Sequence, residues 1–249
     1  MRRLAAVGLV AVLAGGCGTD AAGGTTVTIT VFAAASLTDA FGELGQAFSA
    51  EHPGVRVRFN VGPSPVLATQ VLEGAPGDVL ASADPSATSR VAAAGATLDT
   101  PAVFARNSME IAVPAGNPGR VAGLADFARS DLLVGACAEE VPCGRLARRL
   151  LADAAVAPAI DTEEADVRSL LTRIEAGELD AGLVYRSDVL AAAGRVEGID
   201  VPGADQALAT YEIVALDGSA APGLARAFVA LVGSGVGQRI LADHGFLPR

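Results

Sequence analysis

The sequence predicts an α/β fold with mostly parallel sheets. Segments whose apolar residues alternate with period two, typical of strands, alternate along the chain with amphipathic helical segments. Small or polar residues stand where several strands give way to helices, but none of these turns carries a P-loop or a G-x-G-x-x-G sequence, which argues against a nucleotide enzyme. The 249 residues, 51% of them hydrophobic, are enough for one large core or two smaller lobes.

The N-terminus has the features of an export signal. Two arginines precede the apolar run Leu4–Leu13, and small residues lead to Cys17. The run is too short to span a membrane, and no other stretch of the sequence is long and apolar enough to do so. The cysteine resembles that of a bacterial lipobox, so we expect a lipoprotein signal peptide over 1–17, lipidation of Cys17 and a flexible tether over 18–26. Because Ala14 stands where leucine is usual, the alternative is cleavage at an Ala-x-Ala-like site and free secretion.

The first predicted strand, Val27–Phe32, leads through three alanines to Ser36. Asp39 follows three positions later, and the apolar residues after it recur at helical spacing, so Ser36 is predicted to cap a helix. The unpaired N–H groups and the dipole of a helix N-terminus can hold a small anion without Lys or Arg. The alternative is that Ser36 only caps its helix.

The pattern repeats in the next segment. A strand over Gly54–Phe59 is followed by the turn Gly62–Pro65 and a helix opening at Val66 behind Ser64. The other predicted strands are Asp78–Ala81, Met109–Val113, Leu132–Gly135, Ala181–Tyr185 and Tyr211–Leu216. The other predicted helices are Pro85–Ala94, a short one within 118–129, one from Gly144, Val167–Ala176 capped by Asp166, Ser187–Ala193, Pro222–Val232 and Val236–Asp243.

The net charge and the cysteines argue for or against particular partners and metal sites. The formal net charge is −10, all 18 basic residues are arginine and they form no cluster, which argues against nucleic acid as a partner. Cys137 and Cys143 are six positions apart, and an exported protein favours a disulfide between them, an unpaired buried pair being the alternative. Zinc would need further ligands, and only His52 and His244 are available as histidines.

Four predicted helix starts therefore carry small or polar residues: Ser36, Ser64, Cys143-Gly144 and Asp166-Val167. Parallel sheets bind ligands at the carboxyl ends of their strands, where helices begin. If the four starts converge, backbone donors and hydroxyls would form an anion site.

Five segments, in this order, resemble the extracytoplasmic molybdate-binding proteins of ABC importers. The most specific are Val31-Phe32-Ala33-Ala34-Ala35-Ser36-Leu37-Thr38 and Gly182-Leu183-Val184-Tyr185-Arg186-Ser187-Asp188. The others are Gly74-Ala75-Pro76-Gly77-Asp78-Val79, Val141-Pro142-Cys143-Gly144 and Glu164-Ala165-Asp166-Val167-Arg168. The resemblance covers the chain from about Val27 to Phe246.

The resemblance implies a type II periplasmic-binding-protein fold with a cleft between two lobes, 27–105 plus 219–249 and 106–218. The lobes would close over one tetrahedral oxyanion, held by the hydroxyls and N–H groups of Ser36 and Ser64, the N–H groups of Cys143 and Val167, and the Tyr185 hydroxyl. The chain departs from the family at two of these positions. Prolines 63 and 65 remove two N–H groups from the second turn, and Cys143 replaces a usual alanine, so that a disulfide would hold its loop.

The resemblance also implies a function without chemistry. We expect an extracytoplasmic monomer, attached to the membrane only through lipid on Cys17, that captures molybdate and also tungstate for an ABC permease and needs no cofactor. Arg168 and Arg186 adjoin the site, but the resemblance gives them no contact with the ion.

The alternatives come from other classes. A receptor for sulfate or phosphate would also bind a tetrahedral ion, and a sensor module is a further alternative. A hydrolase is disfavoured because neither serine has a nucleophile-elbow pattern. An iron receptor is disfavoured because the only tyrosines, Tyr185 and Tyr211, are far apart in sequence.

Overall fold

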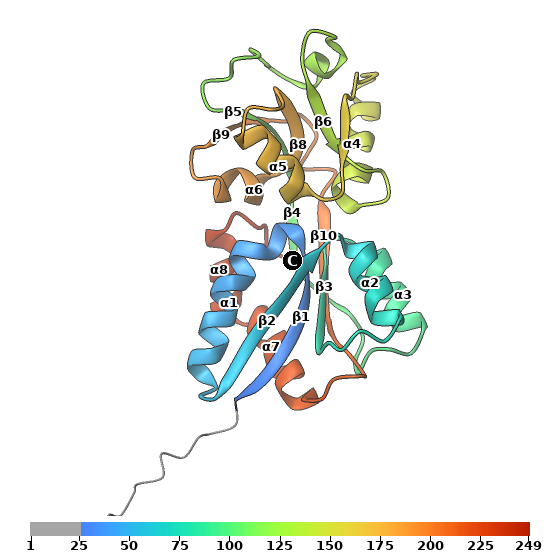
Figure 1. Ribbon diagram of the computed structural model, residues 1–249, viewed down its shortest axis with the longest axis vertical. Helices are drawn as coiled ribbons and strands as arrows, with labels where there is room; N and C mark the ends of the chain where they lie inside the picture. Colours follow the sequence, from blue (N-terminus) through green and yellow to red (C-terminus); the bar gives the residue numbers. More distant parts are fainter. Residues whose placement is uncertain (1–25) are drawn as a thin grey trace, which may run out of the picture.

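The computed structural model describes residues 26–249 and shows two α/β lobes stacked along the long axis of the molecule (Figure 1). The predicted signal peptide, Cys17 and nearly all of the predicted tether lie outside the described residues. Each lobe is built on a five-stranded sheet.

The first lobe has the strand order β2-β1-β3-β10-β4. β1 pairs in parallel with β2 and β3, whereas β10 runs antiparallel to both β3 and β4. The strands are β1 (Val27–Ala34), β2 (Val55–Gly62), β3 (Val79–Ser82), β4 (Ala102–Asn107) and β10 (Ala209–Ala215).

The second lobe repeats this arrangement in the order β7-β6-β8-β5-β9. β6 pairs in parallel with β7 and β8, and β5 runs antiparallel to β8 and β9. Each sheet is therefore mixed, with as many antiparallel pairings as parallel ones, and the prediction of mostly parallel sheets is corrected to this extent. The strands are β5 (Met109–Pro114), β6 (Val134–Cys137), β7 (Thr162–Glu164), β8 (Ala181–Tyr185) and β9 (Val196–Asp200).

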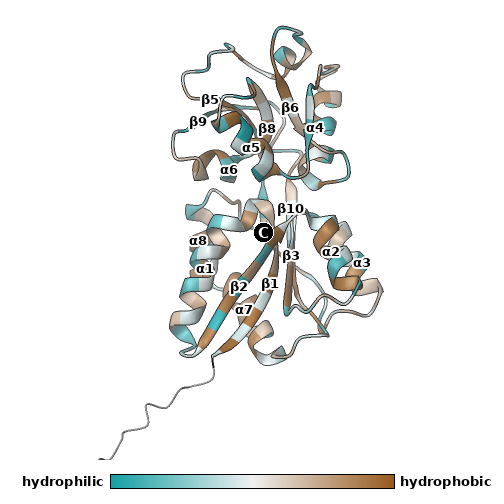
Figure 2. Ribbon diagram, viewed as in Figure 1, coloured by the Kyte–Doolittle hydropathy of each residue, from teal (hydrophilic) through white to brown (hydrophobic). Residues whose placement is uncertain are grey.

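Helices cover both faces of each sheet (Figure 1). Hydrophobic and hydrophilic residues are interspersed along the helices and strands (Figure 2), and the buried core is mostly apolar. In the first lobe the helices are α1 (Thr38–Glu51), α2 (Ser64–Leu72), α3 (Pro85–Ala93), α7 (Pro222–Gly233) and α8 (Gly235–Asp243). In the second lobe they are α4 (Pro142–Asp153), α5 (Val167–Glu175), α6 (Arg186–Ala191) and the 3₁₀ helix Leu124–Ala128. A buried group of phenylalanines (Phe41, Phe48, Phe104 and Phe228) packs between α1, α7 and the first sheet, with its rings edge to face or tilted.

The chain passes between the lobes twice, from β4 to β5 through Ser108 and from β9 to β10 through residues 201–208. The second passage corrects the expected lobe boundary, because β10 belongs to the first sheet although 106–218 was assigned to the second lobe. The sequence analysis predicted the strand Tyr211–Leu216, but a local sequence pattern carries no information about which sheet a strand joins.

The segment Gly74–Val79 has a structural role in the first lobe. The buried carboxylate of Asp78 accepts hydrogen bonds from the Thr30 N–H (2.6 Å) and the Ser219 hydroxyl (2.5 Å), which joins β1 to the chain beyond β10. A Cβ on Gly77 would lie 2.0 Å from the Phe32 ring, so only glycine fits there.

Within residues 26–249, no single helix is both long and apolar enough to cross a membrane. Only α7 and α8 taken together reach the required length and composition, and a bend of 60° separates them.

Candidate functional site

A small cavity lies where the two lobes meet. Its volume is about 20 Å³, little more than the roughly 10–15 Å³ that a single water needs, so the cavity is small. All five residues that the sequence analysis assigned to an oxyanion line it: Ser36, Ser64, Cys143, Val167 and Tyr185. The other lining residues are Ala34, Ala35, Pro63, Ala83, Val141, Pro142 and Asp166.

Ser36 reaches the cavity in a way that the sequence did not predict. Ala35–Leu37 form a 3₁₀ turn, α1 begins only at Thr38, and the Ser36 side chain makes no capping hydrogen bond. Its Oγ lies 2.8 Å from the Tyr211 hydroxyl instead. The prediction of a serine cap is therefore wrong, because the tight turn moves the start of the α-helix past the serine.

Ser64 is the first residue of α2, and Pro63 occupies the capping position. The Ser64 Oγ accepts a hydrogen bond from the Ala83 N–H (3.1 Å), which links α2 to the end of β3. Ser64 is thus not the predicted cap either. The prolines at 63 and 65 carry no N–H, so this turn offers the cavity the N–H and hydroxyl of Ser64.

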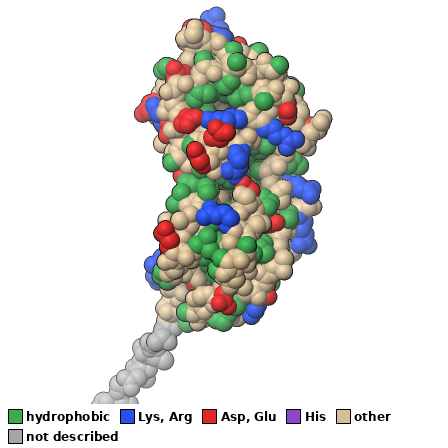
Figure 3. All heavy atoms as spheres, turned by 90° about the vertical axis from the view of Figure 1, so that its right-hand side faces the viewer, with side chains coloured by type: hydrophobic (Ala, Val, Ile, Leu, Met, Phe, Trp, Pro, Cys, Tyr) green, Lys and Arg blue, Asp and Glu red, His purple; other side chains and the backbone are tan. Residues whose placement is uncertain are grey.

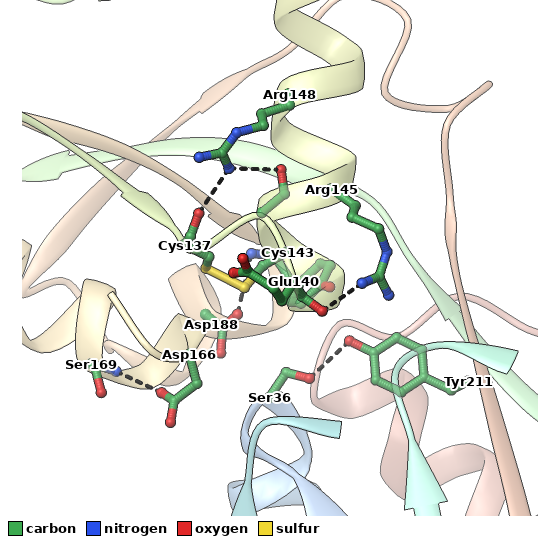
Figure 4. The surroundings of a disulfide bond; sticks show 12 residues. Ser36, Cys137, Glu140, Cys143, Arg145, Arg148, Asp166, Ser169, Asp188 and Tyr211 are labelled. Atoms are coloured by element: carbon green, nitrogen blue, oxygen red, sulfur yellow. Dashed lines mark hydrogen bonds between the residues drawn. A yellow bond between two sulfur atoms is a disulfide. The ribbon is translucent and has the colours of Figure 1, made fainter. Parts of the chain in front are cut away.

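The second lobe contributes two helix starts. Cys143 is the second residue of α4 and Val167 the first of α5, so neither N–H can find a carbonyl within its own helix. Asp166 caps α5 as predicted, its carboxylate accepting from the Ser169 N–H at 2.9 Å (Figure 4). This bond gives the one carboxylate in the cavity wall a partner in its own helix.

A disulfide joins Cys137 at the end of β6 to Cys143 in the first turn of α4, with their Cα atoms 5.8 Å apart (Figure 4). Arg148 of α4 donates a hydrogen bond to the Cys137 carbonyl (3.0 Å). The loop also lies directly on the helix, since a Cβ on Gly144 would be 1.9 Å from the Ala138 carbonyl oxygen. These contacts hold the Cys143 N–H in place.

Tyr185 ends β8 and is 1% exposed. Among the described residues its hydroxyl has no hydrogen-bond partner, although its ring meets that of Tyr211 edge to face at 6.1 Å. Burial, followed by the nearby Tyr211 and Asp188, raises the pKa of the Tyr185 phenol well above its usual value. The hydroxyl therefore stays protonated, a buried donor without an acceptor.

Two arginines flank the cavity without lining it, and the sequence analysis missed what they do. Arg168 of α5 pairs with Asp39 of α1 (Nη1–Oδ2 2.9 Å), and Arg145 of α4 pairs with Asp84, which caps α3. Each pair crosses from the second lobe to the first. Arg186 instead faces Glu110 within its own lobe (3.9 Å).

A wider groove of about 320 Å³ adjoins the cavity, with which it shares Ala83 and Pro142. Asp84, Arg145 and Arg149 supply its charged groups. Figure 3 shows arginine and acidic side chains interspersed on one face of the molecule near the junction of the lobes.

The cavity therefore offers hydroxyl and amide donors, and no Arg, Lys or His is among the residues that line it. His52 hydrogen-bonds the Phe48 carbonyl and His244 pairs with Glu43, so both ring systems are engaged elsewhere. Within 26–249, no group of three or more His, Cys, Asp or Glu residues is arranged to hold a metal cation. The arrangement fits the binding of a small anion.

Comparisons with known proteins agree with this geometry. Residues 29–247 match the family described as bacterial extracellular solute-binding protein. The chain is 42% identical over 219 residues to the molybdate-binding protein ModA of Mycobacterium tuberculosis, covering 88% of this chain and 84% of the relative.

Two solved structures share the fold. The periplasmic molybdate-binding protein of Azotobacter vinelandii superposes with a TM-score of 0.75 at 20% identity, covering 89% of this chain and 100% of that one. The sulfate-binding protein SubI of M. tuberculosis superposes with a TM-score of 0.78 at 18% identity, covering 89% and 87%. From its match along nearly the whole described chain, this protein belongs to the bacterial extracellular solute-binding proteins.

Proposed function

We propose that the protein captures molybdate, and also tungstate, outside the cytoplasm and delivers it to an ABC permease. The observation that supports the proposal is that residues from both lobes line one cavity. In this proposal Ser36, Ser64 and Tyr185 supply hydroxyls to the ion, and Cys143 and Val167 supply N–H groups. The similarity to a molybdate-binding relative at 42% identity supports the choice of ion.

Such a site would neutralise a dianion through dipoles and hydrogen bonds. Hydrogen bonds to charged groups are stronger than those between neutral groups, and the first N–H groups of α4 and α5 add the positive ends of two helix dipoles. Apart from Asp166, whose carboxylate already accepts from the Ser169 N–H, the polar groups of the wall are donors. They favour an oxyanion without protons, because a P–OH group would need an acceptor. The proposal therefore ranks molybdate, tungstate and sulfate above hydrogen phosphate.

The protein in this proposal binds its guest and changes no bond. A serine nucleophile needs a base within hydrogen-bond reach, and the hydroxyls of Ser36 and Ser64 face Tyr211 and the Ala83 amide. The partners in this account are the ion and the permease, the protein acts as a monomer without a cofactor, and lipid on Cys17 attaches it to the membrane.

Isothermal titration with molybdate, tungstate, sulfate and hydrogen phosphate tests the proposal. We expect molybdate and tungstate to bind at one ion per chain, sulfate more weakly and hydrogen phosphate least. Tighter binding of sulfate would instead make this protein a sulfate receptor, the function of one of its structural neighbours.

A variant links the affinity to the cavity. Replacing Ser36 by alanine should weaken molybdate binding by about 1–3 kcal/mol, since it leaves one oxygen of the buried ion without a donor. An unchanged dissociation constant would remove Ser36 from the site.

A further inference from the structure

Tyr211 lies behind the anion site and does not line it. It belongs to β10 of the first lobe, its side chain is fully buried, and its hydroxyl is 2.8 Å from the Ser36 Oγ (Figure 4). In the sequence, Tyr211 was notable only as a residue of a predicted strand whose distance from Tyr185 disfavours an iron receptor. Its contact with Ser36 joins residues 175 positions apart.

The direction of this hydrogen bond determines what Ser36 can do. A serine hydroxyl has one proton and two lone pairs. If Ser36 gave its proton to Tyr211, it would present only lone pairs to the ion and repel it. If Tyr211 donates instead, the proton of Ser36 is free to point into the cavity.

The surroundings of Tyr211 favour the second direction. Burial, the largest effect, raises the pKa of the fully buried Tyr211 phenol, so the phenol keeps its proton. Among the described residues, Ser36 is the one hydrogen-bond partner of the Tyr211 hydroxyl. If Ser36 donated, the buried phenol proton would have no acceptor, which costs free energy, whereas Ser36 lines the cavity and can direct its own proton there.

We propose that Tyr211 is a positioning residue for the anion site. Its hydroxyl donates to Ser36 and makes that serine a donor toward the bound ion, so that a chain of hydrogen bonds runs from Tyr211 through Ser36 to the ion. Hydrogen bonds in such a chain polarise one another. The proposal rests on the proposed function, since it needs an oxyanion in the cavity.

A double-mutant cycle tests the coupling. Titration with molybdate compares the wild type with Y211F, S36A and the double variant. We expect Y211F to weaken binding about three- to tenfold, the range of one neutral hydrogen bond. In the S36A background the same change should alter the affinity by less than about twofold, because its partner is gone.

Tyr185 supplies the matched control. Y185F removes the phenol hydroxyl of an equally buried residue that lines the cavity and makes no hydrogen bond to Ser36, so its loss of affinity should multiply with that of S36A. Unfolding without ligand, measured for all variants, separates a loss of affinity from a loss of fold. If Y211F binds like the wild type, or loses the same factor with and without Ser36, the inference is overturned.

Tyrosine absorbance gives an independent readout, because the chain holds two tyrosines and no tryptophan. In Y185F the only tyrosine is Tyr211. As the ion draws on the Ser36 proton, Tyr211 should donate more strongly and its absorbance should shift to longer wavelength at saturating molybdate. An unshifted spectrum would contradict the proposal.

The experiment separates the two claims. A wild type that binds none of the oxyanions overturns both the proposed function and the role of Tyr211. A wild type that binds molybdate, with no coupling between Tyr211 and Ser36, overturns only the latter.

Discussion

The two walls of the cavity differ in how their polar groups are satisfied. On the first-lobe side, the Ser36 and Ser64 hydroxyls already have partners within that lobe. On the second-lobe side, the hydroxyl of Tyr185 is buried without a hydrogen-bond partner among the described residues. The N–H groups of Cys143 and Val167 have no partner in their own helices. An unpaired buried polar group costs free energy. The serine hydroxyls of the first-lobe wall are therefore hydrogen-bonded without a ligand. The donors of the second-lobe wall would gain their partners from a bound anion.

The largest expected effect concerns Asp188, directly behind Tyr185. Its Oδ2 accepts from the Tyr185 N–H (3.1 Å) and its Oδ1 lies 3.9 Å from Arg168. Burial raises the pKa of Asp188 to about 7, against the opposing effect of Arg168. Each unit of such a shift corresponds to about 1.4 kcal/mol.

The folded protein thus holds this proton more tightly than the unfolded chain. The contribution of Asp188 to stability is present at low pH and is lost as pH rises from about 4 to about 7. Denaturant unfolding at pH 5 and pH 8 should show a smaller fall in unfolding free energy for Asp188→Asn, which keeps an acceptor for Tyr185, than for the wild type. Equal falls would show that Asp188 does not titrate in this range.

Removing the disulfide tests whether the loop that carries the Cys143 N–H must be held in place for binding. Replacing Cys137 and Cys143 by serine should lower the free energy of unfolding by about 2–4 kcal/mol. Molybdate affinity should fall as well, since the Cys143 N–H would need ordering on binding. Reduction of the wild type is the control, and an affinity independent of the bond would show that Gly144 and Arg148 alone hold the loop.

Tyr185→Phe sharpens the comparison most cleanly. Affinity should fall by about 1.5–3 kcal/mol, the range for a hydrogen bond to a charged group. The stability of the ligand-free protein should stay the same or rise, because the substitution removes a buried hydroxyl that has no partner. Titration and urea unfolding check the two effects, and a destabilised variant with unchanged affinity would reverse our assignment.

Ser64→Ala is the counterpart on the first-lobe side. It leaves the Ala83 N–H without its acceptor, so the ligand-free protein should lose about 1–2 kcal/mol of stability in addition to affinity. Thermal unfolding without molybdate detects this loss. If Ser64→Ala kept full stability while Tyr185→Phe lost stability, the contrast between the two walls would be the reverse of the one described.

The smallest effect is expected from the ion pairs between the lobes. Arg168 and Asp39 are both partly exposed, so Arg168→Gln should change affinity by less than about 1 kcal/mol, and added salt should reduce the difference. Arg149→Gln, whose partner Asp153 lies on the same helix, is the matched control. A larger effect would mean that charge pairs, and not the cavity donors, dominate closure.

Local patterns predicted much of the fold because they are local. The alternation in Val27–Phe32 and the Asp166 cap before Val167 each depend on residues within one turn or strand, and both elements are present. β4 escaped prediction because its first four residues are all apolar and its last two are polar, so it shows no period-two alternation. The sheet that β10 joins depends on pairing between distant residues.

The functional site likewise has a part that the sequence predicted and a part that depends on contacts between distant residues. The five lining residues came from segments that resemble a family, and the structure brings all five together. The groups that support or flank them could not be predicted, since Tyr211 meets Ser36, and Arg145 meets Asp84, only after the chain has folded. No spacing in the sequence connects such pairs.

Anomalous diffraction at the molybdenum edge, from crystals grown with molybdate, tests the central claim most directly. The account predicts one strong peak in the cavity, within hydrogen-bond reach of the Ser36, Ser64 and Tyr185 hydroxyls. A peak in the adjoining groove beside Arg145 and Arg149, with none in the cavity, would contradict it.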